Sequence, residues 1–378
     1  MALPSAEDPR RRPRCDDRDV ARPVRAREGR SARLQGCERP RRTSGARGPD
    51  QRRLDPAPRG CCDVGVDGVV PHHLRRPLRG RVPASAPRMI ARLRLQLEGI
   101  GWLLAWRIAR WLPEAWVYRT FERLSTRSMR RNAKRRAAVE TLLRPVVPAD
   151  ALRDEVEKAF RWYGRYWAET FRIADLTDAE LDARFACEGR ENIEKAFASG
   201  KGGVLATLHV GNWDAGGRWV AKHWPLTVVV EVLRPRMLFD RFVEHRRALG
   251  MTIIPLERGS DPTGRCIEQL KKGEMVALVA DRDLSGSGVE VTMFGRKTKM
   301  PPGPAVLAVR TGCDLIPAAI FQGEDGTWLA RVLPPVERPD EPAPDAVQVY
   351  TQRLAEQFEE LIRFAPAQWH VFNRYWID

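Results

Sequence analysis

The chain lacks a membrane-spanning apolar run and the motifs of several common enzyme classes. In its most apolar segment the uninterrupted part is only residues 99–106, far short of the roughly 20 residues that a helix needs to cross a bilayer. No Walker loop, dinucleotide-binding glycine fingerprint or Gly-x-Ser-x-Gly elbow is present. These absences argue against a P-loop nucleotidase, a Rossmann dehydrogenase and a serine hydrolase of the α/β type.

Cysteine spacing excludes two further possibilities. The total of seven is odd, which argues against a disulfide framework, and no pair has the spacing of a zinc site. We therefore expect no metal and a reducing, cytoplasmic environment. Four cysteines lie before residue 89 and three lie singly in apolar surroundings: Cys15, Cys37, Cys61, Cys62, Cys187, Cys266 and Cys313.

Residues 1–88 contain no Phe, Trp, Tyr or Lys, but they contain 22 Arg and 12 Pro. With 11 acidic residues they carry +11 of the formal net charge of +16. Such a segment buries too little apolar surface to offset the entropy of ordering it, so we expect disorder. Met89 resembles a start site, and we expect a chain that begins there to be fully active. An Arg-rich tail can also bind nucleic acid, but we expect no specific nucleic-acid partner.

Residues 89–148 combine Trp and Leu with regularly placed Arg, and a basic cluster follows at 127–136. This pattern predicts amphipathic helices that lie on an anionic membrane surface. The alternative is a core helix followed by an ordinary solvated face.

Residues 149–378 alternate apolar β-branched runs with amphipathic segments, which predicts an α/β body with a mixed, mostly parallel central sheet flanked by helices. The expected strands are 184–188, 203–208, 226–232, 251–255, 275–280, 289–294, 314–321 and 328–332, and the expected helices are 149–175, 191–198, 213–223, 238–249, 264–272, 303–311 and 345–364.

Two strands of this body are each followed by ionisable residues. His209 comes directly after strand 203–208, and Asp214 lies in the first turn of the next helix. Asp281 follows strand 275–280. The carboxyl ends of parallel strands are where open α/β sheets place their chemistry, and an imidazole oriented by a carboxylate is a general base. Either Asp281 or Asp214 can be the partner, and the plainer alternative is a structural histidine with Asp214 or Asn212 as a helix cap.

The motif His209-Val-Gly-Asn-Trp-Asp214 resembles the lysophospholipid and lipid A-type acyltransferase superfamily, and in particular its actinobacterial phosphatidylinositol mannoside acyltransferases. Matching segments include Phe242-x-x-x-Arg246, residues 286–295 and 300–304, and Gln368-Trp-His-Val-Phe, so the resemblance extends over about 89–378. It implies transfer of an acyl group from acyl-coenzyme A, as co-substrate and without a cofactor, to a mannosylated phosphatidylinositol at the cytoplasmic face of the membrane.

The resemblance also implies roles for single residues. His209 is the base, and Asp281 stands where the family has a Glu that pairs with it. Glu231 lies near the acceptor sugar, and Arg246, or alternatively Arg247, lies near the acyl donor. Weaker candidates for the donor site are Ser287 and Arg310, whereas His370 is expected to be structural and His223 and His245 to be exposed.

Two rival functions fit the same residues. One is an acyltransferase with another acceptor, such as a lysophospholipid or a lipid A-like glycolipid. The other is a membrane-binding protein without activity, which would show no turnover of acyl-coenzyme A.

Overall fold

The computed structural model describes residues 86–232, 235–257, 259–283, 286–339 and 344–378. The tail predicted for residues 1–88 therefore lies outside the described residues except for its last three positions. Those three belong to the first helix, α1 (Ala86–Trp111).

The described part of the chain begins with four helices. After α1 come α2 (Glu114–Arg131), α3 (Ala133–Leu143) and α4 (Leu152–Arg172), which is shorter than the predicted 149–175 and ends in a 3₁₀ turn. Pro113 precedes α2, and the Asn132 side chain caps α3 by accepting a bond from the backbone N–H of Arg135. No helix in the described part of the chain is long and apolar enough to cross a membrane.

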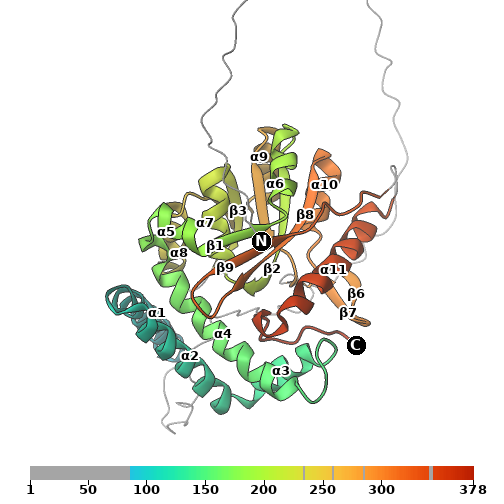
Figure 1. Cartoon of the computed structure of the whole chain (residues 1–378). Coiled ribbons are helices and arrows are strands. Elements are labelled where there is room, and N and C mark those ends of the chain that lie inside the picture. Colours follow the sequence, from blue (N-terminus) through green and yellow to red (C-terminus); the bar gives the residue numbers. More distant parts are fainter. Residues whose placement is uncertain (1–85, 233–234, 258, 284–285, 340–343) are drawn as a thin grey trace, which may run out of the picture. The chain divides into compact units, whose positions relative to one another are not determined.

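Helix α4 runs past the end of the sheet and joins the helices to it (Figure 1). Its N-terminal half packs into the main core, and its C-terminal half packs against α1 and α2. A Cβ at Gly164 would lie 2.5 Å from the Phe121 carbonyl oxygen, so only glycine allows α2 to approach α4 this closely.

The central sheet has seven strands in the order β1-β9-β8-β2-β5-β3-β4. All neighbours are parallel except β8 and β9, which confirms the predicted mixed, mostly parallel sheet. The strands are β1 (Phe185–Glu188), β2 (Gly203–Gly211), β3 (Leu226–Glu231), β4 (Thr252–Leu256), β5 (Met275–Val279), β8 (Asp314–Gln322) and β9 (Trp328–Val332).

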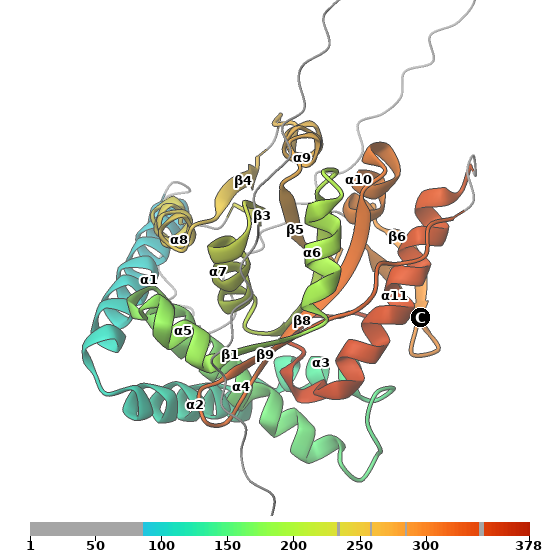
Figure 2. The ribbon, with the colours of Figure 1, turned by 45° about the horizontal axis from the view of Figure 1, so that its top comes forward.

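Helices cover both faces of this sheet (Figure 2). One core lies beneath α6 (Arg190–Ala198), α7 (Trp213–His223) and α8 (Arg236–Ala248), near α5 (Asp178–Arg184). The other lies beneath α9 (Pro262–Lys271), α10 (Gly303–Thr311) and α11 (Ala346–Phe364), with parts of α3 and α4.

Two local predictions are wrong. Strand β2 does not stop at residue 208 but continues to Gly211, so His209 lies inside it, within an irregularity between Thr207 and Gly211. A strand was also not predicted: β7 (Arg296–Met300) pairs antiparallel with β6 (Val289–Met293) as a separate hairpin. Basic residues occupy the other positions of β7 and mask the alternation of buried and exposed side chains that predicts a strand. Only Thr298 and Met300 of this strand are buried.

The end of the chain returns to β2. After the 3₁₀ turn Pro366–Gln368, Trp369 forms an antiparallel bridge with Val210, and the His370 N–H donates to the His209 carbonyl oxygen over 2.6 Å. This return fixes the backbone of the strand that carries His209.

Candidate active site

His209 is paired with Asp281, the second residue after β5. Nδ1 of His209 lies 2.6 Å from Oδ1 of Asp281, and since an ionised carboxylate only accepts hydrogen bonds, Nδ1 carries the proton. Oδ2 of Asp281 accepts bonds from the His209 backbone N–H and the Trp369 indole N–H, at 3.2 and 2.9 Å. The fixed Nδ1 proton leaves the lone pair of Nε2 available.

Asp281 is completely buried. Burial acts to raise its pKa, but the charge and hydrogen bonds of His209 and the bond from Trp369 lower the pKa below its usual value. The side chain is therefore ionised near neutral pH and stabilises an imidazolium on His209.

Asp214 contacts Arg246 and not His209. Nε of Arg246 donates to Oδ1 over 2.7 Å and Nη2 donates to Oδ2 over 3.3 Å, while the Tyr166 hydroxyl donates to Oδ2 over 3.1 Å. Burial raises the pKa of Asp214, but the Arg246 charge outweighs it and lowers that pKa. Of the two arginines predicted for this place, Arg246 lies at the cavity and Arg247 is exposed.

A buried carboxylate that the sequence analysis missed supports the turn between His209 and Asp214. Glu169 of α4 accepts bonds from the Asn212 amide, the Trp328 indole N–H and Arg165, at 2.9, 2.7 and 3.1 Å. Asn212 in turn caps α7 by accepting a bond from the Ala215 N–H. The only sequence signal was an Arg-x-x-x-Glu pair among aromatic residues of α4, where an ionised side chain needs a buried partner.

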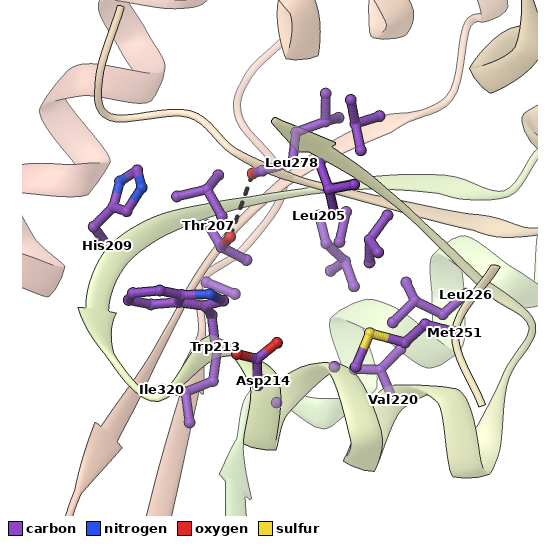
Figure 3. Close-up of a pocket in the computed structure, with 18 of the residues that line it drawn as sticks. Leu205, Thr207, His209, Trp213, Asp214, Val220, Leu226, Met251, Leu278 and Ile320 are labelled. Carbon is purple, nitrogen blue, oxygen red and sulfur yellow. Dashed lines mark hydrogen bonds between the residues drawn. The ribbon is translucent and has the colours of Figure 1, made fainter. Parts of the chain in front are cut away.

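His209, Asp214 and Arg246 line a cavity of ≈ 560 Å³, a size typical of small-molecule sites. One part lies between α7 and the sheet and is apolar, as Figure 3 shows for Leu205, Val220, Leu226, Met251 and Ile320. Another part reaches the opposite face, beside α9 and α10, where Leu278 and Leu307 line it. His209 and the indole of Trp213 lie at the polar end, with ring centroids 5.4 Å apart.

Two glycines of α7 shape the apolar part. A Cβ on Gly216 would lie 2.5 Å from Cγ1 of Ile320, and a Cβ on Gly217 would lie 2.6 Å from Cε of Met251. Because Gly216 and Gly217 have no side chains, the first turn of α7 lies close to the sheet. The cavity continues past this turn toward Met251.

A charged pair lies at the cavity beside β3. Glu231 ends that strand, and its carboxylate is 3.9 Å from Nη2 of Arg282. Both residues line the cavity, as does Asp283, which accepts bonds from the backbone N–H groups of Gly286 and Gly288. Glu231, which the resemblance places near the acceptor, thus lines the same cavity as His209.

The structure does not bring Ser287 and Arg310 to this place. Both are exposed and neither lines the cavity, because Ser287 lies in the loop before β6 and Arg310 lies in the last turn of α10. Together with the alternative candidate Arg247, they are the predicted site residues that the fold does not assemble with His209.

The predicted exposure of two histidines is also wrong. His245 is 3% exposed and packs edge-on against Trp106, and burial lowers its pKa to about 4. His223 is half-buried, with Nδ1 2.8 Å from the Trp219 carbonyl oxygen.

Among the described residues that line the cavity, none is an activated sulfur nucleophile. Burial raises the pKa of the lining cysteines, Cys187 and Cys266, to about 11. Both are thus thiols near neutral pH and poor nucleophiles. Within the described ranges no three His, Cys, Asp or Glu side chains are grouped as metal ligands.

Comparison with known proteins gives the same family as the motifs. The model of the bacterial lipid A biosynthesis acyltransferase family matches residues 90–377. A phosphatidylinositol mannoside acyltransferase of Mycolicibacterium smegmatis is 35% identical over 305 residues, which are 79% of this chain and 95% of that protein. Its counterpart in Mycobacterium tuberculosis H37Rv is 37% identical over 279 residues, which are 72% of this chain and 86% of that protein. The resemblance inferred from the motifs is confirmed, and the chain belongs to the bacterial lipid A biosynthesis acyltransferase family.

Proposed function

We propose that the protein transfers a long-chain acyl group from acyl-coenzyme A to a mannose hydroxyl of a phosphatidylinositol mannoside. The observation that carries this proposal is the His209–Asp281 pair at the polar end of an apolar cavity. The names of the two relatives support the acceptor, and the family description supports acyl transfer.

The reaction needs one base and no covalent enzyme intermediate. Nε2 of His209 takes the proton of the acceptor hydroxyl as its oxygen attacks the thioester carbonyl, and Asp281 stabilises the imidazolium. The tetrahedral intermediate collapses by breaking the carbon–sulfur bond, and the imidazolium returns its proton to the departing coenzyme A thiolate. The products are the acyl ester and the free thiol, and general-base catalysis of this kind contributes about 10²–10⁴-fold.

Arg246 is the proposed electrophilic group. Asp214 holds its guanidinium by two hydrogen bonds, so it is presented at the cavity in a fixed orientation. A preorganised cation near a developing oxyanion stabilises the transition state without further reorganisation. Glu231 is proposed to accept hydrogen bonds from acceptor hydroxyls, and the apolar part of the cavity to hold the acyl chain.

The surface of α1 and α2 supports a peripheral location on the membrane. Along α1, the apolar side chains of Leu97, Ile100, Leu104, Ile108 and Trp111 recur at helical spacing, and each is between 45% and 77% exposed. Leu112 follows α1, and Trp116 and Leu124 of α2 are similarly exposed. An exposed apolar stripe flanked by Arg is typical of helices that lie in the headgroup region. We therefore propose that this surface docks on the cytoplasmic face of the membrane.

The decisive experiment is a mass-spectrometric assay with acyl-coenzyme A and a panel of acceptors. The proposal expects acylation of phosphatidylinositol mannosides and loss of transfer in a folded His209→Ala variant. Preferred acylation of a lysophospholipid or a lipid A-like glycolipid would replace the acceptor but keep the chemistry. Wild-type activity in His209→Ala would refute the mechanism, and no turnover with any acceptor would favour a binding protein.

A further inference from the structure

His370 lies next to His209 on the neighbouring strand segment. Since Val210 bridges Trp369 in an antiparallel pair and the His370 N–H bonds to the His209 carbonyl, His209 and His370 are directly opposite each other. Residues opposite each other in an antiparallel pair point to the same face. Both imidazoles line the same cavity.

The two imidazoles differ in their partners. The His209 ring is bound to Asp281, whereas neither ring nitrogen of His370 has a hydrogen-bonding partner among the residues that the structure describes. The His370 side chain is nevertheless buried, at 5% exposure. Buried polar groups are nearly always hydrogen-bonded, so two unpaired nitrogens on a residue that lines the cavity indicate a group that pairs with a ligand.

The His370 ring does not act through a positive charge. Burial, and next the charge of His209, lower the pKa of His370 to about 3, so its ring is neutral at working pH. A neutral imidazole offers one N–H donor and one nitrogen acceptor. It can therefore neither serve as a cationic acid nor bind an anion by charge.

We propose that His370 is a specificity-determining residue that hydrogen-bonds a hydroxyl group of the acyl acceptor, a neighbour of the hydroxyl that reacts at His209. This inference rests on the proposed function and adds to it a second polar contact for a polyol acceptor. Because the two imidazoles are cross-strand neighbours, a diol whose one hydroxyl meets His209 places the next one toward His370.

The chemistry of the nitrogens favours the acceptor over the thioester. A hydroxyl group both donates and accepts, so it can pair with either nitrogen, and a polyol can pair with both. A carbonyl oxygen only accepts and would leave one nitrogen unpaired. Arg246 already supplies a cation for the thioester oxygen. The aromatic surroundings also fit a sugar ring, whose C–H face packs on such side chains: the Tyr163 and Tyr166 centroids lie 5.5 and 6.0 Å from His370.

The test is a cycle of variants and acceptors. The wild type, His370→Leu and His370→Gln are assayed with acyl-coenzyme A and a short-chain phosphatidylinositol mannoside, and with its monodeoxy analogues that keep the reacting hydroxyl. We expect His370→Leu to lower kcat/KM for the parent acceptor by about 10-fold, the effect of one lost hydrogen bond. For one deoxy analogue, the wild type and His370→Leu should have equal kcat/KM values, because that analogue lacks the hydroxyl group that His370 would bind.

The glutamine variant protects the test against a folding defect. Its amide keeps a donor and an acceptor, so it should restore part of the preference for the parent acceptor even where the leucine variant is unstable. His245→Leu is the matched control, because His245 is also buried with an unpartnered Nε2 among the described residues but does not line the cavity. It should leave the ranking of the acceptors unchanged.

Three results would overturn the inference. The first is an equal loss for the parent and all analogues, which would assign His370 to the acyl donor. The second is no loss in either His370 variant, and the third is an altered acceptor ranking in His245→Leu. Failure of the wild type to acylate any mannoside would instead refute the proposed function itself.

Discussion

Asp214, the last residue of the His-x-x-x-x-Asp motif, is bound to Arg246 through two hydrogen bonds, whereas the motif's histidine is bound to Asp281. Figure 3 shows the indole of Trp213 beside His209, with Asp214 at the start of the next helix. The two carboxylates therefore have separate partners, and their substitution should have separate effects.

Replacing Asp214 should affect stability before chemistry. Asp214→Ala leaves the largely buried guanidinium of Arg246 without its partner, and breaking a buried pair costs about 3–5 kcal/mol. Denaturant unfolding measures this loss. The double variant Asp214→Ala/Arg246→Leu is the control, because it removes both charges and should recover part of the stability. A double variant less stable than Asp214→Ala would contradict a direct pairing.

Replacing Asp281 should affect chemistry. Asp281→Asn removes the charge that fixes the Nδ1 proton of His209 and stabilises the imidazolium, and a comparable loss in a catalytic triad lowers kcat about 10⁴-fold. We expect a loss of about 10³-fold or more in kcat with a small change in KM, measured by coenzyme A release. Asp281→Glu keeps the charge, so it should retain more activity than Asp281→Asn. Equal activity of the two variants would show that the charge is not needed.

Acid should destabilise the protein already below pH 6.5, before most carboxylates are protonated. The folded-state pKa values of His245 and His370 are lowered to about 4 and about 3, while an unfolded histidine has a pKa of about 6.5. Between these values the unfolded chain binds more protons, so stability falls as the pH falls. Each histidine contributes a slope of about 1.4 kcal/mol per pH unit.

The measurement is denaturant unfolding between pH 7 and pH 4.5. His245→Gln should reduce the slope of unfolding free energy against pH by about the contribution of one histidine. Asp214 and Asp281 have lowered pKa values in the folded state, so they add a further loss of stability only at lower pH, as the pH falls toward those values. An unchanged slope in His245→Gln would mean that this ring is not kept neutral by burial.

The sequence predicts the sheet because apolar β-branched runs alternate with amphipathic segments, and this local pattern survives in β2, β3, β5 and β8. It also places His209 and Asp281 at the carboxyl ends of two predicted strands, and the corresponding strands β2 and β5 are direct neighbours in the sheet. The local sequence pattern could not decide whether Asp281 or Asp214 pairs with His209, because the choice of partner depends on the order of the strands in the sheet.

The remaining differences depend on tertiary contacts. The antiparallel return of residues 369–370 onto β2 has no local signal, and it is this return that buries His370 beside His209. Likewise, the helix pattern of α8 gives His245 a polar position, but packing against Trp106 of α1 buries it. Contacts between distant segments thus decide which histidines face the cavity.

The exposed stripe of α1 should determine membrane binding. Replacing Ile108 and Trp111 by Ser removes two apolar side chains of this stripe that are 54% and 77% exposed. Because their burial in the headgroup region is lost, binding to anionic vesicles should fall by about 10-fold or more. Co-sedimentation with vesicles containing phosphatidylinositol measures this loss of binding.

Ile377→Ser is the matched control. Ile377 is an apolar side chain that is 41% exposed near the other end of the sequence, so its replacement should leave vesicle binding unchanged. Turnover of a short-chain soluble acceptor should be retained in the α1 variant, because neither substituted residue lines the cavity. Equal vesicle binding by the α1 variant and the control would assign membrane attachment to another part of the protein.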